Sequence, residues 1–203
     1  METDRTSSAY PTRYVSPWQM KTGEPVIIRP IRPEDEPALA RFHETLSDRS
    51  VYLRYFHMEK LSSRVAHDRL ARRCSIDYDR EMALVAERRN PAGAGKEIIA
   101  VGRLIQEPET RDAEVAVIVA DAFQRCGLGS ELLRRLIQVG RDEKLERITA
   151  TTLPENLPMR SLMARAGFAV VNTFDLSAIS MELKPEEKSG AASQQSGPRH
   201  WLL

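Results

Sequence analysis

The most informative residues of the sequence form a short loop that contains two glycines. Residues 115–120 are an apolar run, and Gln124, Gly127 and Gly129 follow it just before a strongly amphipathic helical pattern begins. Glycine lets the backbone approach a ligand closely, and the free N–H groups of a first helical turn lie at the positive end of the helix dipole. This spacing favours a diphosphate-binding loop, although a plain strand-to-helix turn would show the same two glycines.

Two common nucleotide-binding motifs do not match this loop. A Rossmann fingerprint needs a third glycine at the position of Leu132, and the Walker sequence with its lysine is absent. The loop therefore belongs to neither class.

The other chemically reactive residues carry weaker signals. The four histidines are His43, His57, His67 and His200. They lack the spacing of a zinc site, so no metal is expected. Cys126 lies in the glycine loop without a paired histidine motif, and we expect a small tolerated side chain there rather than a nucleophile. Three arginines, Arg69, Arg72 and Arg73, recur within one helical stretch, either as a solvated face or as contacts to a phosphate or an acidic partner.

These residues must be positioned by the elements around them. The β-type runs are 26–28, 82–86, 98–104, 113–120, 148–153, 168–171 and 179–183. The helical stretches are 33–46, 63–73, 128–144 and 156–166. Turn residues separate the second, third and fourth β runs, which predicts an antiparallel meander. The order of elements predicts an α+β fold with a mixed, mostly antiparallel sheet flanked by helices.

Length and composition favour one domain with appendages. The chain has 203 residues, 41% of them hydrophobic, and we expect a domain over 25–183. Residues 1–24 have no period of 2 or 3.6 and are expected to form an arm, loose or folded along the surface, whose aromatic residues favour docking. Residues 184–203 are a polar low-complexity run that is expected to be disordered.

Charge and apolar content narrow the class of partner. A net charge of +1 gives no sign of nucleic-acid binding, and two cysteines fit reduced thiols in a cytoplasm. No run of apolar residues is long enough to span a bilayer, and the first residues lack a signal-peptide core, so we expect a cytoplasmic protein without a membrane partner.

The glycine loop in this context resembles the acyl-CoA pyrophosphate loop of the GNAT superfamily of N-acetyltransferases. The resemblance covers most of residues 25–183 and includes residues 28–35 (IRPIRPED), 153–156 (LPEN) and 163–168 (MARAGF). Residues 77–86 (DYDREMALVA), with 53–56 (LRYF), are similar to bacterial Pat-type protein lysine acetyltransferases and to the GNAT module of ADP-forming acyl-CoA synthetases.

The resemblance implies roles for particular residues. The backbone of the apolar run would pair with the pantetheine arm of acetyl-CoA like an added strand, the loop N–H groups would bind the pyrophosphate, and one asparagine would contact the cofactor. The residues implied are Val117, Ile118, Val119, Gln124, Arg125, Cys126, Gly127, Leu128, Gly129, Ser130 and Asn156.

The resemblance also implies a general base and exposes one departure. Glu114 matches the carboxylate that accepts a proton from the attacking amine in several members, although it could also be a solvated acid at the start of a strand. Many members carry a tyrosine general acid four residues before the closing Gly-Phe, and here that position is Met163, which has no proton to donate.

The implied function is transfer of an acetyl group from acetyl-CoA to an amine by direct attack. The expected acceptor is a protein lysine, and an acyl-CoA synthetase is a candidate partner. Two alternatives stay open, which are a small-molecule amine as acceptor and a non-catalytic acyl-CoA-binding module. A monomer and a homodimer are both compatible with the sequence.

Overall fold

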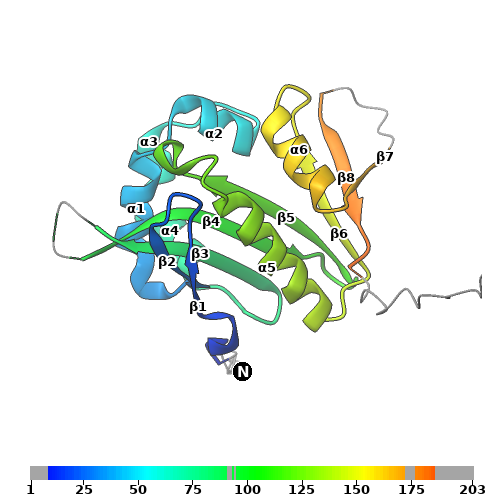
Figure 1. The fold of residues 1–203 in the computed structure, drawn as a ribbon, viewed down its shortest axis with the longest axis horizontal. Coiled ribbons are helices and arrows are strands. Elements are labelled where there is room, and N and C mark those ends of the chain that lie inside the picture. Colours follow the sequence, from blue (N-terminus) through cyan, green and yellow to red (C-terminus); the bar gives the residue numbers. More distant parts are fainter. Residues whose placement is uncertain (1–8, 91–92, 94, 172–176, 186–203) are drawn as a thin grey trace, which may run out of the picture.

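The computed structural model describes residues 9–90, 93, 95–171 and 177–185. Within them, eight strands form one mixed sheet in the order β1-β2-β3-β4-β5-β6-β8-β7 (Figure 1). The strands are β1 (Ser16–Gln19), β2 (Pro25–Pro30), β3 (Glu81–Arg89), β4 (Lys96–Gln106), β5 (Asp112–Val119), β6 (Arg147–Thr152), β7 (Ala169–Val171) and β8 (Ile179–Leu183). Neighbouring strands run antiparallel except β5 and β6, which run parallel, so the predicted sheet is confirmed.

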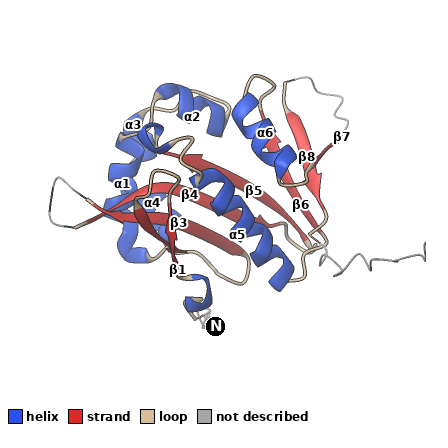
Figure 2. Cartoon of the chain, in the orientation of Figure 1, coloured by secondary structure: helices blue, strands red, loops and turns tan. Residues whose placement is uncertain are grey.

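Helices cover both faces of the sheet (Figure 2). The α-helices are α1 (Glu36–Glu44), α2 (Asp48–Tyr55), α3 (Leu61–Arg64), α4 (His67–Cys74), α5 (Leu128–Asp142) and α6 (Leu157–Arg165). The 3-10 helices are η1 (Thr12–Tyr14), η2 (Pro33–Asp35) and η3 (Asp121–Phe123). α5 lies in front of the sheet in Figure 1, where Leu132 and Leu136 are fully buried. A second core, which includes Phe42 and Leu70, lies between the opposite face and α1, α2 and α4.

The sequence pattern did not predict α2, and it merged two helices into one. α2 buries only Val51, so it has no apolar stripe to reveal it. Its start is marked instead by Ser47, whose hydroxyl accepts a hydrogen bond from the backbone N–H of Ser50 (3.2 Å). The expected helix over 63–73 is divided between α3 and α4.

The described part of the expected N-terminal arm belongs to the sheet. β1 pairs with β2 in antiparallel register, from Ser16 opposite Ile28 to Gln19 opposite Pro25. Met20, directly after β1, is buried in the core. Of the expected C-terminal tail, only Lys184 and Pro185 lie within the described residues.

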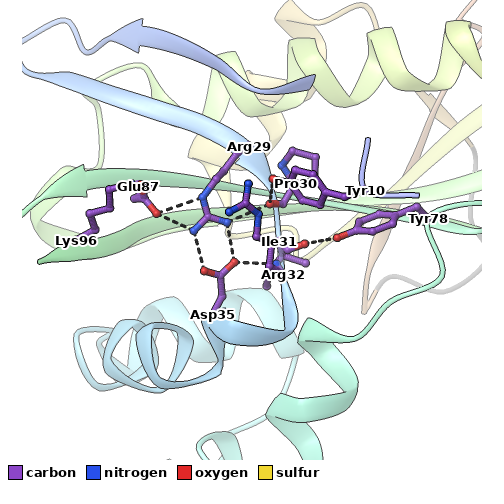
Figure 3. A network of polar contacts seen from close by, with 9 residues as sticks. All are labelled: Tyr10, Arg29, Pro30, Ile31, Arg32, Asp35, Tyr78, Glu87 and Lys96. Atoms are coloured by element: carbon purple, nitrogen blue, oxygen red, sulfur yellow. Dashed lines mark hydrogen bonds and ion pairs between the residues drawn. The ribbon is translucent and has the colours of Figure 1, made fainter. Parts of the chain in front are cut away.

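A buried ionic network fastens β2 to the first helical turns (Figure 3). The guanidinium of Arg29 donates two hydrogen bonds of 2.7 Å to the carboxylate of Asp35 and contacts Glu87 of β3 at 2.7 Å. Lys96 of β4 pairs with the same glutamate. Removal of Arg29 would leave the buried carboxylate of Asp35 without an ion-pair partner, at a cost of about 3–5 kcal/mol. The segment 28–35 is therefore held in place where the chain passes from β2 to α1.

Candidate active site

The glycine loop turns the chain from β5 and η3 into α5. Gly127 is the N-cap of α5 and has φ +93°, a backbone conformation that side chains with a Cβ rarely adopt. Arg125 also has a positive φ of 63°. α5 begins at Leu128, and its first intrahelical bond runs from the N–H of Glu131 to the carbonyl of Gly127 (3.0 Å).

The loop presents a row of free backbone donors. No described residue accepts a hydrogen bond from the N–H groups of residues 125–130. Such donors at the start of a fifteen-residue helix favour a negatively charged ligand, because the helix dipole adds partial positive charge there. The loop residues named from the sequence, 124–130, thus form one surface suited to a diphosphate.

Beside this loop the sheet opens between its two parallel strands. The β5–β6 pairing comprises only three positions, from Asp112 opposite Arg147 to Glu114 opposite Thr149. β5 continues to Val119 and β6 to Thr152 without pairing with each other. The open edge of β5 therefore offers backbone groups to an extended ligand, as an edge strand offers them to an added strand.

Alternation along β5 decides which backbone groups face the opening. The N–H of Ala120 bonds to Ile99 of the β4 side (2.9 Å), so Ile118, two residues earlier, also directs its backbone toward β4. The backbones of Val117 and Val119 face the opening instead. Gln124 donates from Nε2 to the carbonyl of Val119 (3.2 Å), which holds the loop against this edge.

A polar cluster ties α2 to the same loop. Asp121 accepts hydrogen bonds from the hydroxyl groups of Ser47 (2.7 Å) and Ser50 (2.9 Å). Burial alone would raise the pKa of Asp121, but the bonds from Ser47 and Ser50 outweigh it and lower that pKa. Gln124 also donates to Ser50 Oγ (3.1 Å). α2 is therefore held beside the open end of β5.

Glu114 lies at the last paired position of β5, where the opening begins. Its side chain is exposed and alternates with those of Val115 and Val117, which are buried against α5, so it faces the α1, α2 and α4 side. No described residue forms an ion pair with it within 4 Å. A free carboxylate at this point can accept a proton from an amine delivered to the opening.

Asn156 caps α6 at the end of the chain segment that follows β6. Its Oδ1 accepts a hydrogen bond from the backbone N–H of Met159 (3.2 Å), and the residue is largely buried. The cap uses the acceptor of this amide, while its Nδ2 makes no hydrogen bond to a described residue. The Nδ2 of Asn156 therefore remains an unused donor at the start of α6.

The fold and the position of this loop can be compared with known proteins. The sequence profile of the acetyltransferase (GNAT) domain matches residues 26–169. The chain belongs to the GNAT acetyltransferase family. None of the described helices is long and apolar enough to cross a membrane.

Two similar proteins and one solved structure place the chain within the GNAT family. The GNAT domain of S. lividans PAT superposes with a TM-score of 0.76 at 28% identity, covering 86% of this chain and 99% of that domain. Acetyltransferase PA5475 of Pseudomonas aeruginosa is 32% identical over 146 residues, covering 72% of this chain and 76% of its own length. Acetyltransferase Pat of Mycolicibacterium smegmatis is 29% identical over 168 residues, covering 82% of this chain. The chain spans 48% of that Pat, about half its length.

The GNAT position that often carries a tyrosine is inside the core of this protein. Met163 of α6 is 1% exposed and packs in the cluster beneath α5. This side chain is therefore shielded from solvent. The methionine that replaces the usual tyrosine is therefore a core packing residue, and it supplies no proton donor to the site.

A groove between α5 and α6 extends the GNAT site away from the sheet. Its volume is about 900 Å³, and it begins at Ser130 in the first turn of α5. Four cations line it, namely Arg134, Arg141, Lys144 and Arg165. The groove therefore places cationic side chains next to the unpaired backbone donors of the glycine loop.

Sequence reasoning missed the hairpin that supports the glycine loop. A Cβ placed on Gly127 would meet Trp18 at 3.2 Å and Lys21 at 3.4 Å. The density of aromatic residues in the N-terminal segment was the only signal of this contact. Arg69 and Arg73, by contrast, belong to α4, on the opposite face of the sheet from α5. Their side chains line a separate cavity there.

Proposed function

We propose that this protein transfers an acetyl group from acetyl-CoA to a lysine side chain of a protein. The observation that carries the proposal is the opening between β5 and β6, bordered by the unpaired N–H groups of residues 125–130 and by the exposed carboxylate of Glu114. The similarity of the chain to relatives named Pat supports a protein lysine as the acceptor.

Each part of the opening has a role in this proposal. The N–H groups of residues 125–130 bind the diphosphate, and the outward backbone of Val117 and Val119 orients the pantetheine arm. Acetyl-CoA supplies a thioester carbon to which the amine nitrogen bonds as the carbon–sulfur bond breaks. Glu114 accepts, directly or through one water, the proton that the lysine ammonium must lose before its nitrogen can attack the thioester carbon. Because Met163 has no proton to donate, we assign the protonation of the leaving thiolate to water.

The test is acetylation of protein lysines with a matched pair of variants. Thiol release from acetyl-CoA is measured with lysine peptides and with an acyl-CoA synthetase as acceptors, and mass spectrometry locates the modified atom. Glu114→Gln should lower kcat by roughly 10²–10³ with CoA affinity unchanged, because basicity is lost while shape is kept. Glu107→Gln, in the turn between β4 and β5, is the control and should retain activity.

Three outcomes contradict parts of the proposal. A Glu114→Gln enzyme with near wild-type kcat would remove the general base. Transfer to polyamines or amino acids but to no peptide would make the acceptor a small molecule. CoA binding without thiol release for any acceptor would make the protein an acyl-CoA-binding module.

A further inference from the structure

A small cavity lies beneath the face of the sheet that carries Glu114. Its volume is about 30 Å³, and it is enclosed by α1, α2 and α4 on one side and by β4 and β5 on the other. Ala116 and Ile118 of β5 form part of its floor. Ala116 is two residues from Glu114 on the same face, a separation of about 7 Å along a strand.

Four arginines line this cavity, and only two of them have a carboxylate partner. Arg69 pairs with Glu59, and Arg103 pairs with Glu81. The other two are Arg54 of α2 and Arg73 of α4. Neither forms an ion pair within 4 Å with any residue that the structure describes. The cavity therefore holds two guanidinium groups that lack a carboxylate at ion-pair distance among the described residues.

The surroundings of these two charges disfavour them. Burial lowers the pKa of Arg54 and the charge of Arg73 adds to that effect, and together they outweigh the opposing influence of Tyr55 and Glu114. Burial also lowers the pKa of Arg73, with a further contribution from Arg103. The guanidinium of Arg54 rests over the ring of Tyr55 (5.2 Å), a contact that leaves its N–H donors free. Partly buried, unpaired cations of this kind are stabilised when an anion joins them.

An independent observation at the same cavity is an unsatisfied buried imidazole. His43 of α1 lines the cavity, is only 6% exposed, and its Nδ1 has no hydrogen-bond partner among the described residues. Burial and the charge of Arg64 lower the pKa of His43 to about 4, so the ring is neutral at pH 7. Buried polar atoms are nearly always hydrogen-bonded, so an orphan here indicates a missing partner.

We infer that this cavity binds a carboxylate carried by the acceptor molecule, held by Arg54, Arg73 and the free nitrogen of His43. A planar guanidinium matches a carboxylate in charge and geometry. The volume exceeds the 10–15 Å³ that one water needs, which leaves room for the two oxygens of a carboxylate. The inference rests on the proposed function, because it places the acceptor's carboxylate two residues along β5 from the proposed general base, Glu114.

Two sources could supply this carboxylate, and paired substrates distinguish them. An acidic side chain beside the target lysine is tested with a lysine peptide flanked by glutamate against the same peptide flanked by glutamine. An α-carboxylate is tested with free lysine against lysinamide. We expect kcat/KM to favour the acid by at least about tenfold in one of these pairs.

Variants assign the preference to the cavity. Arg54→Gln and Arg73→Gln should each reduce the preference to about twofold or less, by removing one of the charge-assisted hydrogen bonds. Arg72→Gln removes the same charge from the adjacent, exposed position of α4 and should keep the preference. CoA affinity should be equal in all three. A wild-type protein without any preference, or a preference that persists in both cavity variants, would overturn the inference.

A binding measurement separates this inference from the proposed function. Glutarate should raise the Tm of the wild-type protein and of Arg72→Gln more than glutaramide does, and it should not do so for Arg54→Gln or Arg73→Gln. If no acceptor is acetylated but this pattern holds, the cavity assignment stands and the catalytic proposal fails. If acetylation proceeds but glutarate and glutaramide act alike on the wild type, the cavity assignment fails.

Discussion

The backbone N–H of Lys21 donates a hydrogen bond to the carbonyl oxygen of Cys126 (3.0 Å). This bond joins the turn after β1 to the glycine loop, and Trp18 packs against Gly127 from the same hairpin. The N-terminal segment therefore supports the surface that we assign to the diphosphate, although it lies outside the motif itself.

Removal of the N-terminal segment should lower both stability and CoA affinity. A chain without residues 1–24 loses the β1–β2 pairing and the buried side chain of Met20, so its Tm should fall by about 6 °C, equivalent to about 2 kcal/mol for a domain of this size. A chain that ends at Pro185 is the control and should keep its Tm, because the carbonyl that Arg141 contacts is retained. Equal Tm values for the two truncations, measured by calorimetry, would contradict this prediction.

The two loop glycines should respond differently to valine. At Gly129 a Cβ would meet Leu162 at an ordinary 3.5 Å, so Gly129→Val should keep its Tm within a few degrees. Its side chain would enter the opening, and titration calorimetry should show CoA affinity reduced at least tenfold, about 1.4 kcal/mol.

Gly127→Val should lose stability as well as affinity, because its φ of +93° and the nearby Trp18 both oppose a branched side chain. Wild-type CoA affinity in a folded Gly129→Val protein would move the diphosphate away from this loop.

Asn156 should reveal two separable roles. Asn156→Ala removes the cap of α6 and should cost about 1 kcal/mol of stability, whereas Asn156→Ser keeps a capping oxygen and should cost about 0.5 kcal/mol or less. Both variants lack the amide Nδ2, so both should bind CoA more weakly if that donor contacts the cofactor. Loss of CoA affinity in the alanine variant alone would reduce Asn156 to a helix cap.

His43 should make the protein less stable at acidic pH. Its pKa is about 4 in the folded state and near 6.5 when unfolded, so the unfolded chain binds more protons between these values. The free energy of unfolding should therefore fall as pH decreases from about 6.5 toward 4, by up to about 3 kcal/mol from this group.

Urea unfolding of wild type and His43→Gln at pH 7, 5.5 and 4.5 measures the effect. Contributions from the carboxylates cancel in the comparison, so the wild type should lose more stability than the variant over this range. Parallel curves for the two proteins would contradict the buried neutral imidazole.

Much of the fold follows from local pattern in the sequence. Strands β3, β4 and β5 have apolar runs bounded by turn residues, and α5 places Leu132, Leu133 and Leu136 on one face. These signals depend on neighbours a few residues away, and so does the glycine loop, whose φ requirement at Gly127 belongs to the residue itself. The resemblance to the GNAT family rested on these same local motifs.

Only the tertiary structure decided which distant residues meet. The opening between β5 and β6 depends on where their pairing stops. β1 joins the sheet through pairing with β2, and its four residues are too few to predict a strand from the sequence. Arg54 and Arg73 come from separate helices, and α2 carries too little apolar surface to be recognised from its sequence. Non-local packing brings their charges to one cavity, and their spacing along the chain does not predict this proximity.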